Sequence, residues 1–257
     1  SVAAALEARA KAAPAEASPD PAMMLYAARV ARGDARGAAA AALIRARTRE
    51  RDAMRAAKEA DAATGSKREL AATRVLTARL EAHCGALLVV VNALRLCAPG
   101  ERSVALSDED GEGFDDDKKE TDAAGGKAAK RRRVPGRGRA TLADLLREYA
   151  LAATRLELLV AGADVASLGF AEERALPTAA ADGGEASSDD ARAAVVPGLV
   201  AACCAHGLFT AATTLATHWT EGEALTNLAT VIAATLAARA ALAQIAAGGS
   251  GARPTSL

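Results

Sequence analysis

Histidine and cysteine are the residues in this sequence whose chemistry could support catalysis. The histidines are His83, His206 and His218. A nucleophile needs an adjacent base and a cavity, and none of these histidines lies in a recognisable nucleophile motif. His206 is expected to close a helix, where an imidazole favours the C-terminal end of the helix dipole. We therefore expect no catalytic residues, no small-molecule substrate and no enzymatic activity.

A zinc site is the main alternative use of these residues. Cys203 and His206 lie three residues apart, and His83 and Cys84 could join them as a tetrahedral ligand set. Zinc ligands usually come in two closely spaced clusters, however, and adjacent helical residues point in different directions. We interpret the cysteines as buried small apolar residues and expect no metal or other cofactor. They are Cys84, Cys97, Cys203 and Cys204.

Residues 99–139 carry an acidic run followed by a basic one and almost no large apolar side chains. Such a segment cannot offset the entropy of ordering, so we expect a disordered insert. The acidic run resembles a calcium loop, but Lys119 stands where a bidentate glutamate is needed, so no calcium site is expected. Ser107 precedes the acidic residues and is a candidate phosphorylation site.

The basic run could contact a phosphate backbone or bind a nuclear import receptor. A solvated linker that balances the acidic run explains it equally well. No aromatic residues are interleaved, so base stacking is not supported and nucleic acid is not the expected partner. The candidate arm consists of Lys127, Lys130, Arg131, Arg132, Arg133, Arg137 and Arg139.

Composition favours an all-α fold. Hydrophobic residues are 51% of the chain but aromatic residues only 2%, and many of the apolar residues are alanine, the best helix former. We expect no β-sheet. Lysine plus arginine and aspartate plus glutamate number 32 each, so no global field attracts nucleic acid or anionic membranes. The longest strongly apolar run, 86–94, is shorter than the roughly 20 residues of a membrane span, so no span is expected.

The first helical block is predicted over residues 1–98. Ser18 is the candidate N-cap of a helix that ends near Gly33 or Gly37, and a long helix follows to about Thr64. A further helix from about Lys67 carries an apolar stripe at steps of three and four that must be buried. The stripe contains Leu76, Leu80, Cys84, Leu87, Val91 and Leu94.

A second helical block is predicted over residues 140–247. Thr141 is a candidate N-cap with Asp144 three residues on, and the helix that follows should turn Arg155 to solvent. A mobile loop is expected at about 162–190, and a frayed tail at 248–257. Gly207 should join two short helices into an antiparallel hairpin before a last helix. Stacked hairpins of this kind predict an α-solenoid.

Four segments resemble the helical region of a large scaffold nucleoporin, the one-hundred-and-sixty-kilodalton family of the Y-shaped outer-ring complex. Their order and spacing are similar to those of the family, whereas Thr210 stands where the family favours aspartate. The sequence is consistent with a fragment of that region. The segments are Met24 to Val30, Leu87 to Leu96, Leu145 to Leu156, and His206 to Ala212.

The resemblance implies a structural role in the nuclear pore complex at the nuclear envelope. Partners would be other Y-complex nucleoporins, and the chain would support nucleocytoplasmic transport and mRNA export through protein contacts. The alternative is a helical adaptor that associates with nucleic acid through the basic disordered arm.

Overall fold

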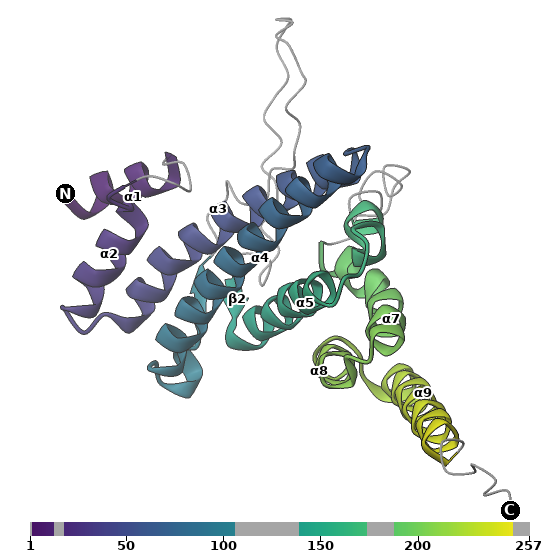
Figure 1. The fold of residues 1–257 in the computed structure, drawn as a ribbon. Helices are drawn as coiled ribbons and strands as arrows, with labels where there is room; N and C mark the ends of the chain where they lie inside the picture. Colours follow the sequence, from purple (N-terminus) through teal and green to yellow (C-terminus); the bar gives the residue numbers. More distant parts are fainter. Residues whose placement is uncertain (1, 13–17, 106–138, 174–187, 249–257) are drawn as a thin grey trace, which may run out of the picture. The chain divides into compact units, whose positions relative to one another are not determined.

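The computed structural model describes residues 2–12, 18–105, 139–173 and 188–248 of the chain (Figure 1). This part is mostly helical, which confirms the predicted all-α class. Two short 3₁₀ turns, η1 (Pro99–Glu101) and η3 (Ala166–Leu168), also occur. The helices are α1 (Val2–Ala12), α2 (Pro21–Val30), α3 (Ala35–Asp61), α4 (Ser66–Arg95), α5 (Leu142–Val160), α7 (Ser188–His206), α8 (Phe209–Trp219) and α9 (Gly222–Gly248).

A short β-ladder corrects the expectation that the chain contains no sheet. Strand β1 (Ser103–Ala105) pairs antiparallel with β2 (Arg139–Thr141), and Val104 faces Ala140 across the ladder. Both of these central residues are buried, so burial and backbone pairing stabilise two strands too short to show an alternating pattern. Residues 99–105 and Arg139, which belong to the predicted disordered insert, are therefore part of the described structure. Residues 106–138 lie outside the described part.

Contacts divide the chain into two compact units, which do not follow the two sequential blocks predicted from the sequence. Unit 1 contains Ser1–Arg47 and Val89–Leu145, and unit 2 contains Thr48–Leu88 and Leu146–Leu257. Helices α3, α4 and α5 each contribute residues to both units.

In unit 1, Asp20 rather than Ser18 caps α2. The Asp20 carboxylate accepts hydrogen bonds from the backbone N–H groups of Ala22 at 3.0 Å and Met23 at 3.3 Å. Pro21 follows at the first helical position, where its missing N–H costs nothing. The other Asp20 oxygen lies 2.9 Å from Nε of Arg45 on α3, so one side chain both starts α2 and fixes it to the next helix.

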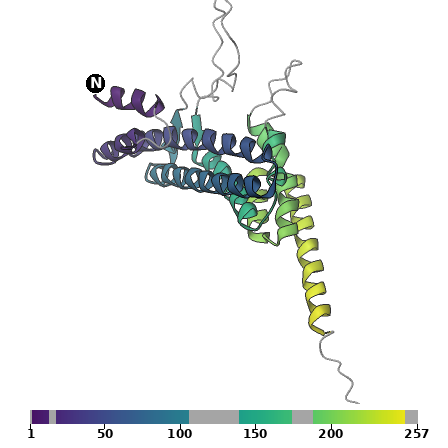
Figure 2. The ribbon, with the colours of Figure 1, turned by 45° about the horizontal axis from the view of Figure 1, so that its top comes forward.

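The predicted α4 stripe is buried, as expected. Its residues Leu76 and Leu80 belong to one core cluster of unit 2, together with alanines of α3, leucines of α5 and the apolar faces of α7 and α8. The α3 positions include Ala53, Ala57 and Ala60, whose small side chains allow neighbouring helices to approach closely. Figure 2 shows α3 and α4 side by side, joined by the short turn at residues 62–65.

Helices α7 and α8 are joined by a tight turn at Gly207, as expected, and pack against each other. Gly207 has φ of +80°, a left-handed conformation that glycine adopts without strain. The following backbone N–H, of Leu208, donates to the Cys203 carbonyl at 2.8 Å and closes the end of α7. Helix α9 then packs on both α7 and α8, with Ile232 buried against them.

Two helices are long and apolar enough to cross a membrane, contrary to the expectation from uninterrupted apolar runs. They are Ser66–Arg95 and Gly222–Ile245. The apolar character of α4 is accounted for by its buried stripe, since core helices of soluble proteins meet the same criterion. Nearly all of the α9 window is exposed. The expectation was drawn from uninterrupted apolar runs, and isolated charged residues such as Glu81 and Arg239 interrupt these two helices.

Candidate functional site: a buried charge cluster and exposed apolar surfaces

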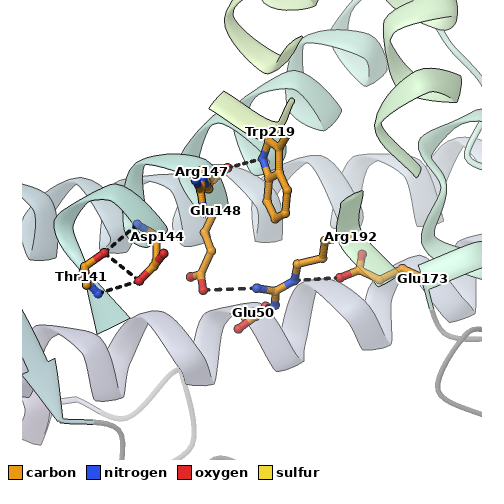
Figure 3. Close-up of polar contacts among 8 residues, drawn as sticks. All are labelled: Glu50, Thr141, Asp144, Arg147, Glu148, Glu173, Arg192 and Trp219. Atoms are coloured by element: carbon orange, nitrogen blue, oxygen red, sulfur yellow. Dashed lines mark hydrogen bonds and ion pairs between the residues drawn. The ribbon is translucent and has the colours of Figure 1, made fainter. Parts of the chain in front are cut away.

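Helix α5 positions several polar side chains in Figure 3, and it begins with the predicted cap. The Asp144 carboxylate accepts from the Thr141 backbone N–H at 2.9 Å and from the Thr141 hydroxyl at 2.7 Å. The Thr141 hydroxyl in turn accepts from the Asp144 N–H at 3.2 Å. This is a reciprocal capping box in which aspartate replaces the usual glutamate, so the cap prediction is confirmed.

Two reciprocal hydrogen bonds connect α5 to the end of α8. The Trp219 indole N–H donates to the Arg147 carbonyl at 2.9 Å. The Arg147 Nε–H donates to the His218 carbonyl at 3.0 Å. His218 therefore contributes its backbone here, and Trp219, half-buried, satisfies its only donor.

Arg192, near the start of α7, is the centre of a cluster of ion pairs in unit 2. Its guanidinium donates to Glu173 at 3.0 Å, to Glu148 of α5 at 3.2 Å, and to Glu50 of α3. Burial opposes the charge, but the three carboxylates prevail and raise the pKa of Arg192 above its ordinary value. The cluster ties α3, α5 and α7 together within the unit.

Arg155 belongs to the same cluster, which overturns the prediction that it faces solvent. It is buried, and its Nε–H donates to the Leu168 carbonyl at 2.9 Å while Nη2 donates to Glu173 at 2.7 Å. Its guanidinium lies 4.2 Å from the Phe170 ring centroid. Burial lowers the pKa of Arg155, and the Glu173 carboxylate opposes that shift. A charged residue can be buried here because its guanidinium meets a carboxylate, a backbone carbonyl and an aromatic ring.

A small cavity lies beside the cluster. Its volume is about 30 Å³, and His83, Leu80 and Phe170 line it together with the charged side chains. This volume suits one or two water molecules and is far below the roughly 300 Å³ at which small-molecule sites begin. The arrangement is thus suited to bracing helices and to holding ordered water.

The structure does not bring the candidate zinc ligands together. Within the described ranges, no three His, Cys, Asp or Glu side chains form a group that could hold a metal ion. Burial raises the pKa of Cys84 to about 11 and that of Cys203 to about 12, so both thiols stay protonated and unreactive near neutral pH. His206 is exposed at the end of α7, as expected.

An open groove in unit 2 runs between η3 and one side of α7. It has a volume of about 280 Å³, large enough for one or two side chains of another molecule. Its floor includes Ala194, Gly198 and Ala202, three small residues at four-residue intervals on α7. The groove is open because these three residues have small side chains or none.

The sequence-predicted arm and phosphorylation site fall almost entirely outside the described residues. Ser107 and the basic residues from Lys127 to Arg137 lie in 106–138. Arg139 is described, and it is exposed in β2, opposite Ala105. The buried cluster around Arg192 was missed because its members are far apart in the sequence and carry no local pattern.

Comparison with known proteins adds no relative to this description. No family model and no curated protein matches the chain.

Proposed function

We propose that this chain is a scaffold segment that acts through contacts with other helical proteins and not through catalysis. The observation that supports this best is the way unit 2 is built. Antiparallel helices pack through alanine and aliphatic faces, an interhelical ion-pair cluster braces them, and the last helix leaves most of its apolar surface exposed. Stacked helix pairs of this kind are the unit of an α-solenoid.

The specific assignment we propose is a segment of a Y-complex scaffold nucleoporin in the nuclear pore complex at the nuclear envelope. It rests on the sequence resemblance. The four resembling segments fall in α2, at the end of α4, in α5 and at the α7–α8 turn. Two of them contain residues that stabilise the fold. Arg147 donates a hydrogen bond to the end of α8, and Gly207 forms the left-handed turn between α7 and α8.

Crosslinking with mass spectrometry in intact cells tests the assignment. We expect crosslinks from this chain to other outer-ring nucleoporins, in repeat experiments at native expression level. If the chain is found at the nuclear envelope but without such crosslinks, or away from the envelope, the assignment is wrong. A scaffold role in another assembly would then appear as reproducible crosslinks to a different set of helical proteins.

The nucleic-acid adaptor remains the second candidate because of the basic run at 127–139. Its test compares the parent chain with a variant in which the seven basic residues are replaced by glutamine. Binding to duplex DNA or RNA that weakens steeply with salt, and disappears in the variant, would favour the adaptor. Unchanged partner crosslinks in the same variant would favour the scaffold.

A further inference from the structure

His83 is a buried titratable residue that lines the small cavity beside the ion-pair cluster of unit 2. It lies on α4 and is 6% exposed. The cavity has a volume of about 30 Å³, so no more than one or two water molecules separate a group on one wall from the opposite wall. The imidazole of His83 therefore lies close enough to the charged residues of the cavity to interact with them electrostatically.

The charged residues in the cavity walls carry one more negative than positive charge. Three carboxylates and two guanidiniums line the cavity, and an arginine does not lose its proton in proteins. On α4 itself, the charged residues nearest to His83 in the sequence are half-buried Arg79 and exposed Glu81, whose charges are opposite. The charged residues of the cavity are Glu50 of α3, Glu148 and Arg155 of α5, Glu173 and Arg192 of α7.

We propose that His83 takes up a proton in the folded protein and that its imidazolium balances the charge of this cluster. Each of the three carboxylates accepts a hydrogen bond from Arg192 (Figure 3), and such a bond favours the ionised form of a carboxylate. An ordinary histidine also binds a proton at a pH about two units higher than a glutamate does. At neutral pH His83 is therefore the group that gains the proton at the smallest cost.

Burial of His83 opposes its charged form, and the carboxylates must outweigh that effect. Arg192 shows that they can, because its side chain is 12% exposed and the same three carboxylates nevertheless raise its pKa. An ordered water in the cavity adds to their effect, since it can accept a hydrogen bond from an imidazolium N–H.

Protonation of His83 makes the stability of unit 2 depend on pH near neutrality. A folded protein that binds a proton more tightly than its unfolded chain is stabilised by that proton. This stabilisation is complete below about pH 6.5, where histidine is protonated in the unfolded chain as well. It is lost as the pH rises through the value at which folded His83 releases its proton. The ion-pair cluster that connects α3, α5 and α7 thus holds these helices most firmly in mildly acidic conditions.

NMR of the full chain with isotope-labelled histidine tests the proposal, because the sequence contains only three histidines. The imidazole signal that is absent from His83→Gln belongs to His83. We expect folded His83 to bind its proton at least about tenfold more tightly than His83 in the chain unfolded by urea. Glu148→Gln removes one carboxylate of the cluster and should weaken this binding, whereas Glu157→Gln on the exposed side of α5 should leave it unchanged.

Urea unfolding of the parent and of His83→Gln gives an independent measurement. Between about pH 8 and about pH 6, the unfolding equilibrium constant of the parent should fall at least roughly fivefold relative to that of the variant, whose glutamine does not titrate. The proposal is overturned if folded His83 binds its proton no more tightly than unfolded His83, or if the two proteins respond equally to pH. It is also overturned if both glutamine variants of α5 change proton binding by His83 equally, or if the glutamate carboxyl signals place the proton on a carboxylate of the cluster. These outcomes do not depend on the pore assignment.

Discussion

Replacing Arg192 by methionine should strongly destabilise unit 2. The arginine side chain is 12% exposed, and its partners Glu148, Glu173 and Glu50 are 11%, 11% and 23% exposed. Methionine fills much of the same volume but carries no charge. The variant therefore removes a guanidinium from three carboxylates in a largely water-excluded position, while Glu173 keeps its ion pair with Arg155.

The expected loss follows from the cost of removing one member of a buried cluster of ion pairs. Removing one partner of a buried ion pair typically costs about 3–5 kcal/mol, against about 5–15 kcal/mol for the whole free energy of unfolding. We expect a loss within that range, which corresponds to a fall in Tm of roughly 6–20 °C for a domain of this size. Arg192→Lys keeps the charge but cannot donate from three nitrogens at once, so it should cost about 1–2 kcal/mol.

Urea unfolding followed by far-UV circular dichroism measures these differences. Arg74→Met on the exposed side of α4 is the matched control and should change stability by less than about 0.5 kcal/mol. Adding Glu148→Gln to Arg192→Met should recover part of the lost free energy of unfolding. The difference in free energy of unfolding between Arg192→Met and the parent should also become smaller as the pH falls, because the carboxylates take up protons. A free energy of unfolding for Arg192→Met within about 1 kcal/mol of the parent, the effect of an ordinary point mutation, would show that the cluster does not stabilise unit 2. A further loss of stability on adding Glu148→Gln would show the same.

Three further perturbations test other features. Thr141→Ala should cost about 1 kcal/mol in urea unfolding because it removes the α5 cap, whereas Thr141→Ser should cost only a few tenths. Trp219→Phe should cost about 1 kcal/mol through the lost bond to the Arg147 carbonyl, and a loss near zero would mean that the bond contributes nothing. Cys84 and Cys203 have folded pKa values of about 11 and about 12 against an ordinary value of 9.0. The unfolded chain therefore releases these protons first, and stability should fall above about pH 9 by up to roughly 1 kcal/mol per pH unit and thiol. The double alanine variant should show a flatter decline over that range, and an equally steep one would assign it to other groups.

Local signals in the sequence were sufficient for most helix ends and for the main apolar stripe. The Thr141–Asp144 cap and the left-handed Gly207 depend on residues within a few positions of one another. The α4 stripe is buried because one face of a helix is set by its own periodicity. Such features need no knowledge of which other segments lie nearby.

Features that depend on distant segments could not be predicted in this way. Arg155 was assigned to solvent from its place on α5, yet its carboxylate partner Glu173 comes from beyond η3. Strand β1 is stabilised by pairing with β2, which follows more than thirty residues later in the sequence. Helix α7 begins at Ser188, inside the predicted loop 162–190. Its first residues include few apolar side chains, so the sequence shows no helical periodicity there. The candidate arm lies outside the described residues, so its role stays a prediction.

The β1–β2 ladder has a consequence for how this chain can be altered. Because Ala105 pairs with Arg139, the two ends of the intervening segment lie at adjacent points. The entropic cost of closing a flexible segment between two adjacent points grows only slowly with the length of the segment. A fluorescent protein or affinity tag could therefore be spliced between these two residues with little effect on Tm, and natural variants of very different length at this position should fold equally well.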